Sequence, residues 1–234
     1  MRQIFLDTET TGLYPDQGDR LIEIGCVELV NRKLTGNNKH FYVNPGRDSH
    51  EEALKIHGIT TEFLSDKPAF AAIAAEFLAY IKDADEIIIH NAAFDLGFLN
   101  REFELCGLAP FKKLVGKVVD SLAMAKEMYP GKRNGLDALC DRLGVDRSGR
   151  TLHGGLLDAE LLADVYINLT RGLDALIMEA ALPEPGVKDA ARVNLSGFEL
   201  PVLLANASEL AAHDDVLAQL DKSSGGKTVW RLAQ

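Results

Sequence analysis

Short apolar runs separated by polar turns open the chain. Residues 4–6 and 21–30 are mostly apolar, and residues 40–43 resume the pattern after the polar turn at 31–33. Runs of this length bounded by turn residues are typical of buried strands. We therefore expect consecutive antiparallel strands at the start of a sheet.

Longer stretches with helical spacing follow these strands. Between residues 68 and 81, apolar side chains recur on one face of a helix. A further apolar run at residues 86–89 predicts another buried strand. Three more helices are expected, at residues 94–106, 136–143 and 156–169. Strands first, then alternating strands and helices, predict an α/β domain built from stacked layers.

A break in the pattern occurs near residues 182–186, where two prolines and a glycine fall close together. A stiff, non-helical connector is expected from such a composition. We therefore expect a domain at residues 1–180, a linker at 181–190 and a tail at 191–234.

The expected tail carries elements of its own. A strand is predicted at residues 202–204 and a helix at 209–220 with Ser208 as its N-cap, followed by a turn at 223–226. A segment this short buries too little apolar surface to form an independent core. We expect it to dock on another surface, with Trp230 as an anchor.

Composition and charge narrow the class of protein. The apolar fraction of 47% is ordinary for a globular chain, no apolar stretch reaches the roughly 18 residues of a membrane span, and no secretory signal precedes the first strand. Cys26, Cys106 and Cys140 are too widely spaced for a disulfide framework or a zinc site, which favours a reducing cytoplasm. The net charge of −10 argues against broad electrostatic binding to nucleic acid, unless metal ions neutralise clustered acids or another protein holds the nucleic acid.

Two acids follow the first apolar run at positions i and i+2. Asp7 and Glu9 would point to the same face of an extended strand. Neighbouring carboxylates repel each other unless a cation joins them, and oxygen ligands without cysteine favour Mg²⁺ or Mn²⁺. Two solvated acids in a strand-to-loop turn are the competing interpretation of this pattern.

Two further motifs lie at corners where a loop enters a helix. Asp95 closes a segment that begins at His90, directly after the strand at 86–89. An acid at a helix start is common for capping and dipole reasons, yet this corner is also where α/β sheets present ligands. His153 precedes two glycines and a helix whose first turn contains Asp158. It is either a surface loop histidine or a base that takes a proton from water.

Together the three motifs are more specific than any one of them. Asp-x-Glu at 7–9, His-Asn-x-x-Phe-Asp at 90–95 and His-x-x-x-x-Asp at 153–158 resemble the DEDD exonuclease superfamily and its DEDDh branch. The resemblance extends over residues 2–171 and more faintly into the tail. Further segments are similar to the proofreading subunits of bacterial replicative DNA polymerases, namely residues 34–38, 57–59, 130–134 and 150–154.

The resemblance implies a ribonuclease-H-like fold, with a mixed sheet flanked by helices, and a two-metal hydrolysis of DNA 3′ ends. It implies that two Mg²⁺ or Mn²⁺ ions are bound by Asp7, Glu9, Asp95 and Asp158. His153 would be the base that deprotonates the attacking water. The residues implied to contact the substrate are Asp7, Glu9, Glu52, His57, His90, Phe94 and Asp158. For Phe94, packing at a helix start is an equally good interpretation.

The implied partners are a single-stranded or frayed DNA 3′ end and a polymerase catalytic subunit, which the tail would tether. A sliding clamp would bind at residues 173–178, although no glutamine leads this segment. A stand-alone ribonuclease and a catalytically inactive scaffold are the alternative functions.

Several polar residues near the motifs have simpler interpretations. Asp120 is expected to cap the following helix and Asp137 to be a helix-start acid. Lys132 and Arg133 either touch phosphate or lie in an exposed turn.

Overall fold

The structure, a computed structural model, describes residues 1–150, 152–171 and 205–225. The chain divides into two units, Met1–Ala181 and Leu182–Gln234, and each is described by itself. Several predicted features lie outside the described residues: the clamp segment 173–178, the linker 181–190, the strand 202–204 and Trp230.

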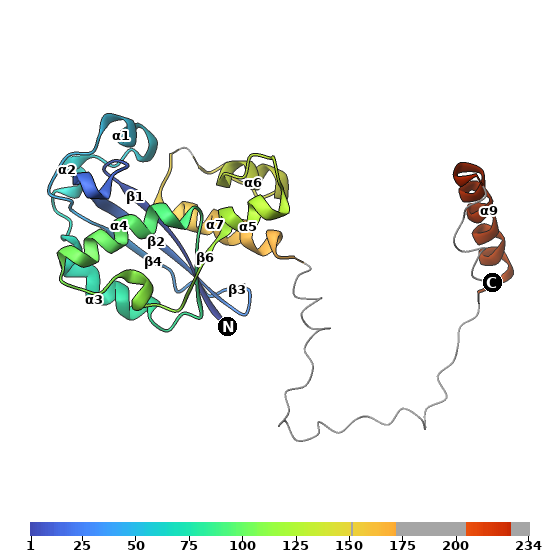
Figure 1. The fold of residues 1–234 in the computed structure, drawn as a ribbon, viewed down its shortest axis with the longest axis horizontal. Coiled ribbons are helices and arrows are strands. Elements are labelled where there is room, and N and C mark those ends of the chain that lie inside the picture. The colour runs from blue at the N-terminus through green and yellow to red at the C-terminus, as the bar shows by residue number, and fades with distance from the viewer. Residues whose placement is uncertain (151, 172–204, 226–234) are drawn as a thin grey trace, which may run out of the picture. The chain divides into compact units, whose positions relative to one another are not determined.

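A mixed β-sheet forms the centre of the first unit (Figure 1). Its strands are β1 (Arg2–Thr10), β2 (Leu21–Val30), β3 (Lys33–Leu34), β4 (Lys39–Tyr42), β5 (Glu86–Ile89) and β6 (Lys117–Asp120). The strand order is β3-β2-β1-β5-β6, with β4 also paired to β2. β2 runs antiparallel to β1, whereas β5 and β6 run parallel to it. The predicted mixed sheet is confirmed.

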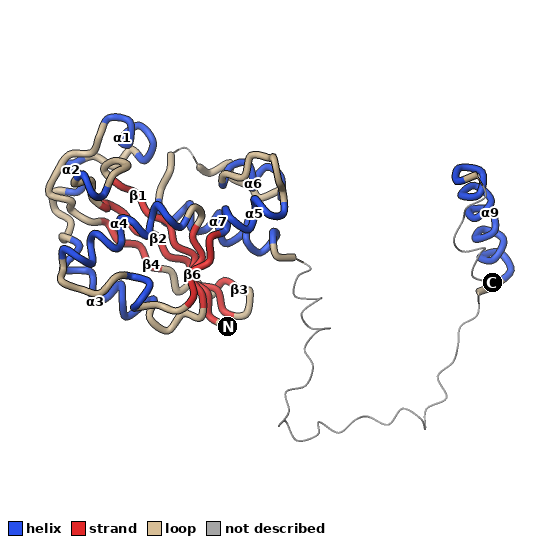
Figure 2. The backbone as a smooth tube through the Cα atoms, viewed as in Figure 1, coloured by secondary structure: helices blue, strands red, loops and turns tan. Residues whose placement is uncertain are grey.

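Helices cover both faces of this sheet (Figure 2). They are α1 (Glu51–His57), α2 (Thr61–Leu64), α3 (Phe70–Ile81), α4 (Ala92–Leu105), α5 (Ser121–Met128), α6 (Leu136–Leu143) and α7 (Gly155–Leu169), with short 3₁₀ turns η1 (Pro15–Gln17) and η2 (Phe111–Lys113). The predicted layered α/β architecture therefore holds.

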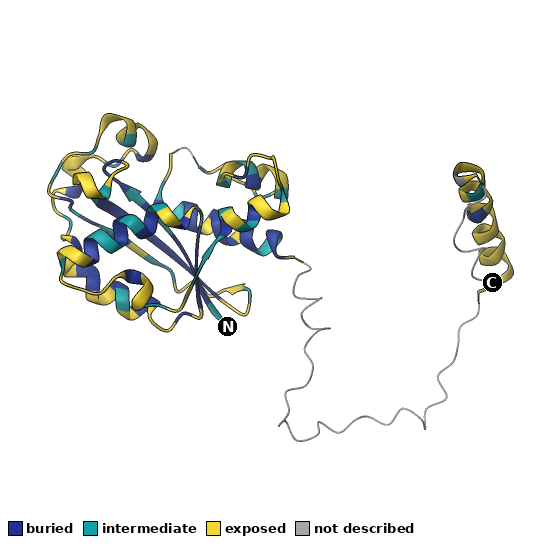
Figure 3. Cartoon of the chain, in the orientation of Figure 1, coloured by how far each residue is buried: buried dark blue, intermediate teal, exposed yellow. Residues whose placement is uncertain are grey.

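The central strand β1 separates two cores, because successive side chains of a strand point to opposite faces. Ile4 and Leu6 pack with aromatic side chains of α3 and α4 on one face. Phe5 packs on the other face against α7, where its ring meets Tyr166 edge-on. Figure 3 shows the strands as the most buried part of this unit.

The sequence-based boundaries differ from the structure mainly near β1 and after β5. β1 continues to Thr10 because its pairing with β2 extends to that residue, so Asp7 and Glu9 lie inside the strand rather than after it. The sequence analysis did not predict α1, α2, β3 and β6, and it implied α5 only as the helix that Asp120 caps. Asp120 caps α5 as predicted, because its carboxylate accepts the amides of Leu122 and Ala123.

The second unit contributes one described helix, α9 (Ala207–Ser224). The predicted Ser208 cap is wrong: the side chain of Asn206 accepts the amides of Ser208 and Glu209, and the Glu209 carboxylate returns to the Asn206 amide. This capping box starts the helix earlier than its apolar spacing indicates. The helix extends to Ser224, beyond the predicted end at residue 220, and its left-handed cap Gly225 lies within the predicted turn. Within the described residues, no helix has the length and apolar character needed to cross a bilayer.

Candidate active site

The acids of the three motifs converge at one edge of the sheet. Asp7 and Glu9 lie on β1, and Asp95 lies in the first turn of α4, directly after β5. Because β5 is parallel to β1, its carboxyl end brings Asp95 beside Asp7. Asp158, in the first turn of α7, enters from the opposite face of the sheet.

A hydrogen bond fixes Asp95 to the central strand. The Thr8 hydroxyl donates to Asp95 Oδ1 at 2.7 Å, and both side chains are buried. Thr8, which stands between the two acids of the first motif, therefore orients the carboxylate of the second motif.

The clustered carboxylates raise one another's pKa. Burial, followed by the charges of Asp95 and Asp158, raises the pKa of Asp7 well above its usual range. Burial, followed by the charges of Glu23 and Asp158, raises the pKa of Glu9 to about 8. Burial also raises the pKa of Asp95 to about 7. Mutual repulsion of this kind is relieved when a multivalent cation binds between the carboxylates.

The third motif places a histidine next to these acids. His153 Nδ1 lies 3.1 Å from Asp158 Oδ2, and the His153 amide donates to the Ile56 carbonyl at 3.1 Å. Ligand atoms of Glu9, His153 and Asp158 all lie within 4.8 Å of one another. This spacing suits one metal ion held by several ligands, and Asp158 Oδ1 is buried without a partner.

A glycine pair allows α7 to come this close. A Cβ on Gly25 of β2 would lie only 2.1 Å from the backbone carbon of Gly155. A Cβ on Gly155 would lie 3.0 Å from the Gly25 amide nitrogen and 3.2 Å from the Asp7 carbonyl. The backbone of α7 therefore rests directly on β1 and β2, and Asp158 reaches the sheet edge. Only Gly155 belonged to a predicted motif.

A fifth acid, Glu23, lies next to Glu9 on the neighbouring strand. Glu23 pairs with Glu9 across the two strands, and its side chain is only 2% exposed. His40 Nε2 lies 2.5 Å from Glu23 Oε1, whereas Oε2 is buried without a partner. The available sequence signal was a charged residue within the otherwise apolar run at 21–30.

Arg150 is a further residue of the site to which the sequence analysis assigned no role. Its Nη2 lies 2.6 Å from Asp158 Oδ2 and 2.6 Å from His153 Nδ1, and its Nη1 donates to Asp137. Its place at the start of segment 150–154, which is similar to the proofreading subunits, was the available signal. Asp137 lies in the first turn of α6 as predicted, and it also pairs with this arginine.

A cavity of about 640 Å³ borders Glu9. Besides Glu9, three of the predicted substrate contacts line it: Glu52, His57 and Phe94. His57 Nδ1 accepts the Ile59 amide at 2.9 Å, so the proton of the neutral ring sits on Nε2, and burial lowers the pKa of His57. Phe94 lines the cavity and also packs against the core and against Phe98, so its packing is observed and its contact with substrate stays a prediction.

His90, the fourth distinct contact, is not among the lining residues of this cavity. Its Nδ1 lies 2.9 Å from the Ser121 hydroxyl at the start of α5, and burial lowers the pKa of His90. It thus links the end of β5 to α5. Its binding role stays a prediction, as do those of Lys132 and Arg133, which lie exposed in the turn before α6.

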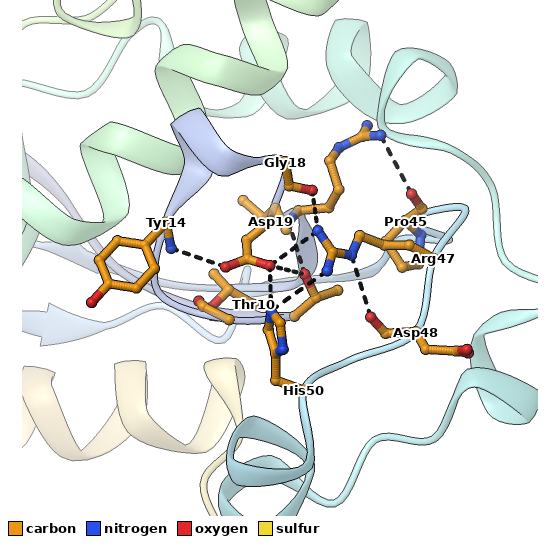
Figure 4. A network of polar contacts seen from close by, with 12 residues as sticks. Thr10, Tyr14, Gly18, Asp19, Pro45, Arg47, Asp48 and His50 are labelled. Atoms are coloured by element: carbon orange, nitrogen blue, oxygen red, sulfur yellow. Dashed lines mark hydrogen bonds and ion pairs between the residues drawn. The ribbon is translucent and has the colours of Figure 1, made fainter.

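A polar network holds two walls of the cavity together (Figure 4). Asp19 accepts the Tyr14 amide at 3.0 Å and lies 3.0 Å from His50 Nε2 and 3.1 Å from Arg47 Nη1. Arg47 Nη1 also donates to the Gly18 carbonyl at 2.5 Å. The network joins the loop after β1 to the segment before α1, and both border the cavity.

Known proteins match this chain over most of its sequence. Residues 4–166 match the family model described as Exonuclease. The chain is 50% identical to the DNA polymerase III subunit epsilon of Pasteurella multocida, over 100% of this chain and 95% of the relative. It is 49% identical to that of Escherichia coli, over 98% and 97% of the two chains, and 56% identical to that of Rickettsia felis, over 74% and 75%.

Solved structures share the fold at lower identity. Exonuclease X in complex with 5′ overhanging duplex DNA superposes with a TM-score of 0.58 at 23% identity, covering 72% of this chain and 91% of that one. E. coli exonuclease I in complex with a dT13 oligonucleotide gives 0.64 at 19% identity, covering 76% and 43%. These structures confirm the predicted ribonuclease-H-like architecture, and the sequence relatives confirm the resemblance. The chain therefore belongs to the exonuclease family, and within it to the epsilon subunits of bacterial DNA polymerase III.

Proposed function

We propose that this chain is a proofreading 3′→5′ exonuclease that removes mispaired 3′-terminal nucleotides as monophosphates. The observation that carries the proposal is the convergence of the acids with His153: ligand atoms of Glu9, His153 and Asp158 lie within 4.8 Å of one another beside a cavity of about 640 Å³. Membership of the epsilon subunits makes DNA the proposed substrate.

Two divalent ions, Mg²⁺ or Mn²⁺, fit this donor set. The ligands that we assign are Asp7, Glu9, Asp95 and Asp158. All are oxygen donors. Burial and mutual repulsion disfavour their ionised forms, and bound cations would stabilise these forms. One neighbour by fold is the zinc ion bound form of the E. coli exonuclease I–DNA complex, so the fold accommodates divalent metal. When bound, the ions would polarise the attacking water and neutralise charge on the leaving 3′ oxygen.

His153 is the proposed base. It lies on the loop before α7, and Asp158 is within 3.1 Å of its Nδ1. A carboxylate at Nδ1 orients an imidazole so that Nε2 can take a proton from water. The hydrogen bond from the His153 amide to the Ile56 carbonyl positions this loop next to α1, which lines the cavity.

The cavity beside Glu9 is the proposed site of the terminal nucleotide. Phe94 offers a ring face for stacking on the base, and His57 offers its Nε2 proton to an acceptor on the sugar or phosphate. Glu52, exposed in the first turn of α1, would accept a hydrogen bond from the 3′ hydroxyl. His90 would contribute indirectly, by supporting the first turn of α4, which carries Asp95.

The proposed partners follow from the relatives and from the charge. Because its net charge is −10, the chain is expected to bind DNA weakly by itself. Tethering to the polymerase catalytic subunit would compensate by raising the local concentration of 3′ ends. The tail at 191–234 is the proposed tether, and residues 173–178 are the proposed contact with the sliding clamp. The cytoplasm is the proposed compartment.

The discriminating experiment compares DNA and RNA oligonucleotides of one sequence in Mg²⁺. We expect faster release of nucleoside monophosphates from the 3′ end of DNA than from RNA, and faster release from a mispaired than from a paired primer end. A preference for RNA would replace the proposal with a ribonuclease function. Digestion from the 5′ end would contradict it.

A further inference from the structure

Arg150 bridges two carboxylates that differ in their surroundings. Asp158 belongs to the proposed metal site and its side chain is 5% exposed, whereas Asp137, on α6, is 53% exposed. The arginine side chain itself is only 7% exposed, and its Nε is buried without a hydrogen-bond partner. A buried guanidinium needs anionic partners, and these two carboxylates supply them.

The guanidinium contacts one oxygen of a carboxylate that the metal ions would use, while the other oxygen has no partner. Arg150 Nη2 lies 2.6 Å from Asp158 Oδ2, close contact for a charge-assisted hydrogen bond. A divalent ion within coordination distance of Asp158 would stand only a few ångströms from this positive charge. Two such cations on one carboxylate repel each other strongly in a site with little water.

Arg150 and Asp158 also compete for the same atom of His153. Nδ1 of His153 lies 2.6 Å from Arg150 Nη2 and 3.1 Å from Asp158 Oδ2. Nδ1 accepts a hydrogen bond from the arginine only when it carries no proton, and it donates to Asp158 only when it does. With the arginine in place, the proton of the neutral ring sits on Nε2, which then cannot act as a base.

We propose that Arg150 is an internal cation that occupies the Asp158 side of the metal site and withdraws to Asp137 when a divalent ion binds. The inference rests on the metal site of the proposed function. Withdrawal frees Asp158 Oδ2 for His153 Nδ1–H, and the lone pair of Nε2 becomes available to take a proton. Arg150 is thus a positioning residue that makes formation of the base dependent on the metal, while Asp137 holds the arginine in its withdrawn position.

The exchange predicts opposite effects of two substitutions on metal affinity. In Arg150→Ala, the competing cation is gone, so Mn²⁺ should bind at least about tenfold more tightly, the size of effect that one adjacent charge commonly has. In Asp137→Ala, the arginine loses the partner that it keeps in the metal-bound state, so Mn²⁺ should bind more weakly. The double substitution should behave like Arg150→Ala alone.

The measurement is calorimetric titration of Mn²⁺ into the full-length protein without DNA. Asp141→Ala is the matched control, because Asp141 lies on the same helix and pairs with Arg147 at 3.0 Å rather than with Arg150. It should bind Mn²⁺ as the wild type does. If Arg150→Ala does not fold, the weaker binding expected of Asp137→Ala still tests the exchange.

Unchanged or weaker Mn²⁺ binding in a folded Arg150→Ala, or unchanged or tighter binding in Asp137→Ala, would overturn the exchange and leave the proposed function standing. A wild-type protein that binds no Mn²⁺, or binds it equally well as Asp95→Asn, would overturn the metal site itself.

Discussion

At the scale of single residues, the site depends on groups that hold the acids as much as on the acids themselves. Thr8 shows this most clearly, since its hydroxyl donates to Asp95 Oδ1 at 2.7 Å in a buried setting. The hydrogen bond opposes the effect of burial on the pKa of Asp95 and so favours the ionised form that binds metal.

Thr8→Val removes this hydrogen bond with little change of shape. We expect Mn²⁺ affinity and exonuclease activity to fall by about tenfold, because a hydrogen bond to a charged group contributes roughly 1.5–3 kcal/mol. Titration of Mn²⁺ and initial rates on single-stranded DNA measure the effect. Thr10→Val is the control: it removes a buried hydroxyl that donates to the Gly12 carbonyl and should leave metal affinity unchanged. An equal loss in both variants would show that Thr8 acts only through general packing.

Glu9 makes the stability of the metal-free protein depend on pH in a distinctive way. Its pKa is raised to about 8 in the folded state, while in the unfolded chain it stays near the ordinary value of about 4.3. The folded state therefore holds a proton that the unfolded state has lost, so the free energy of unfolding decreases as the pH rises between these two values. In EDTA we expect a lower melting temperature at pH 8.5 than at pH 6, and Mn²⁺ should reduce this difference.

Glu9→Gln should flatten the pH dependence in EDTA, because the substituted side chain does not titrate. Glu62→Gln changes the same charge on the exposed surface of α2 and should leave the slope as it is, which separates the site from the general effect of net charge. Equal slopes in the wild type and in Glu9→Gln would contradict the assignment.

At the scale of elements, the close approach of α7 to the sheet builds the site. Gly25→Ala would push a methyl group into the Gly155 backbone, at a distance of 2.1 Å if nothing moved. We expect α7 to shift, activity to fall about a hundredfold and stability to decrease by about 1–3 kcal/mol. Thermal unfolding and initial rates measure both effects.

Gly97→Ala is the matched control for this substitution. Gly97 lies within α4, and an added Cβ would meet Pro15 at an ordinary 3.6 Å. Alanine is the better helix former by about 1 kcal/mol, so this variant should be active and slightly more stable. Full activity of Gly25→Ala would show that the glycine contact does not set the geometry of the site.

Whether an element could be predicted from the sequence depends on the range of the interactions that form it. Strands and helices with a clear apolar period, such as β2 and α3, were predictable because their pattern is local. α1 and β6 were not, since α1 exposes most of its residues and β6 is only partly buried along its four residues. Local periodicity carries little signal in such elements.

The residues of the candidate site differ in the same way in how far the sequence predicts them. The acids and His153 stand in short motifs, so their types and spacing were visible in the sequence. Glu23 and Arg150 act through contacts set by strand register and by the fold of the loop before α7, which no local pattern encodes. The Gly25–Gly155 contact joins positions far apart in the chain and was equally out of reach.

At the scale of the whole molecule, catalysis and attachment to the polymerase are proposed to lie in different units. A chain ending at residue 180 should therefore digest single-stranded DNA at the rate of the full chain, because the site residues all precede that point. It should no longer co-elute with the polymerase catalytic subunit in size-exclusion chromatography. Retained co-elution would place the polymerase contact on the catalytic unit.

The most direct test of the central claim is the removal of a mispaired 3′ nucleotide from a primer–template by the wild-type chain and by Asp7→Ala. With Mg²⁺, the wild type should release the terminal nucleotide as a monophosphate, and EDTA should abolish this release. Asp7→Ala should be inactive in Mg²⁺ while its melting temperature in EDTA stays at or above that of the wild type, because the substitution removes a buried carboxylate with a raised pKa. Mg²⁺-dependent release by a folded Asp7→Ala at the wild-type rate would contradict the metal site, and with it the account of how this chain acts.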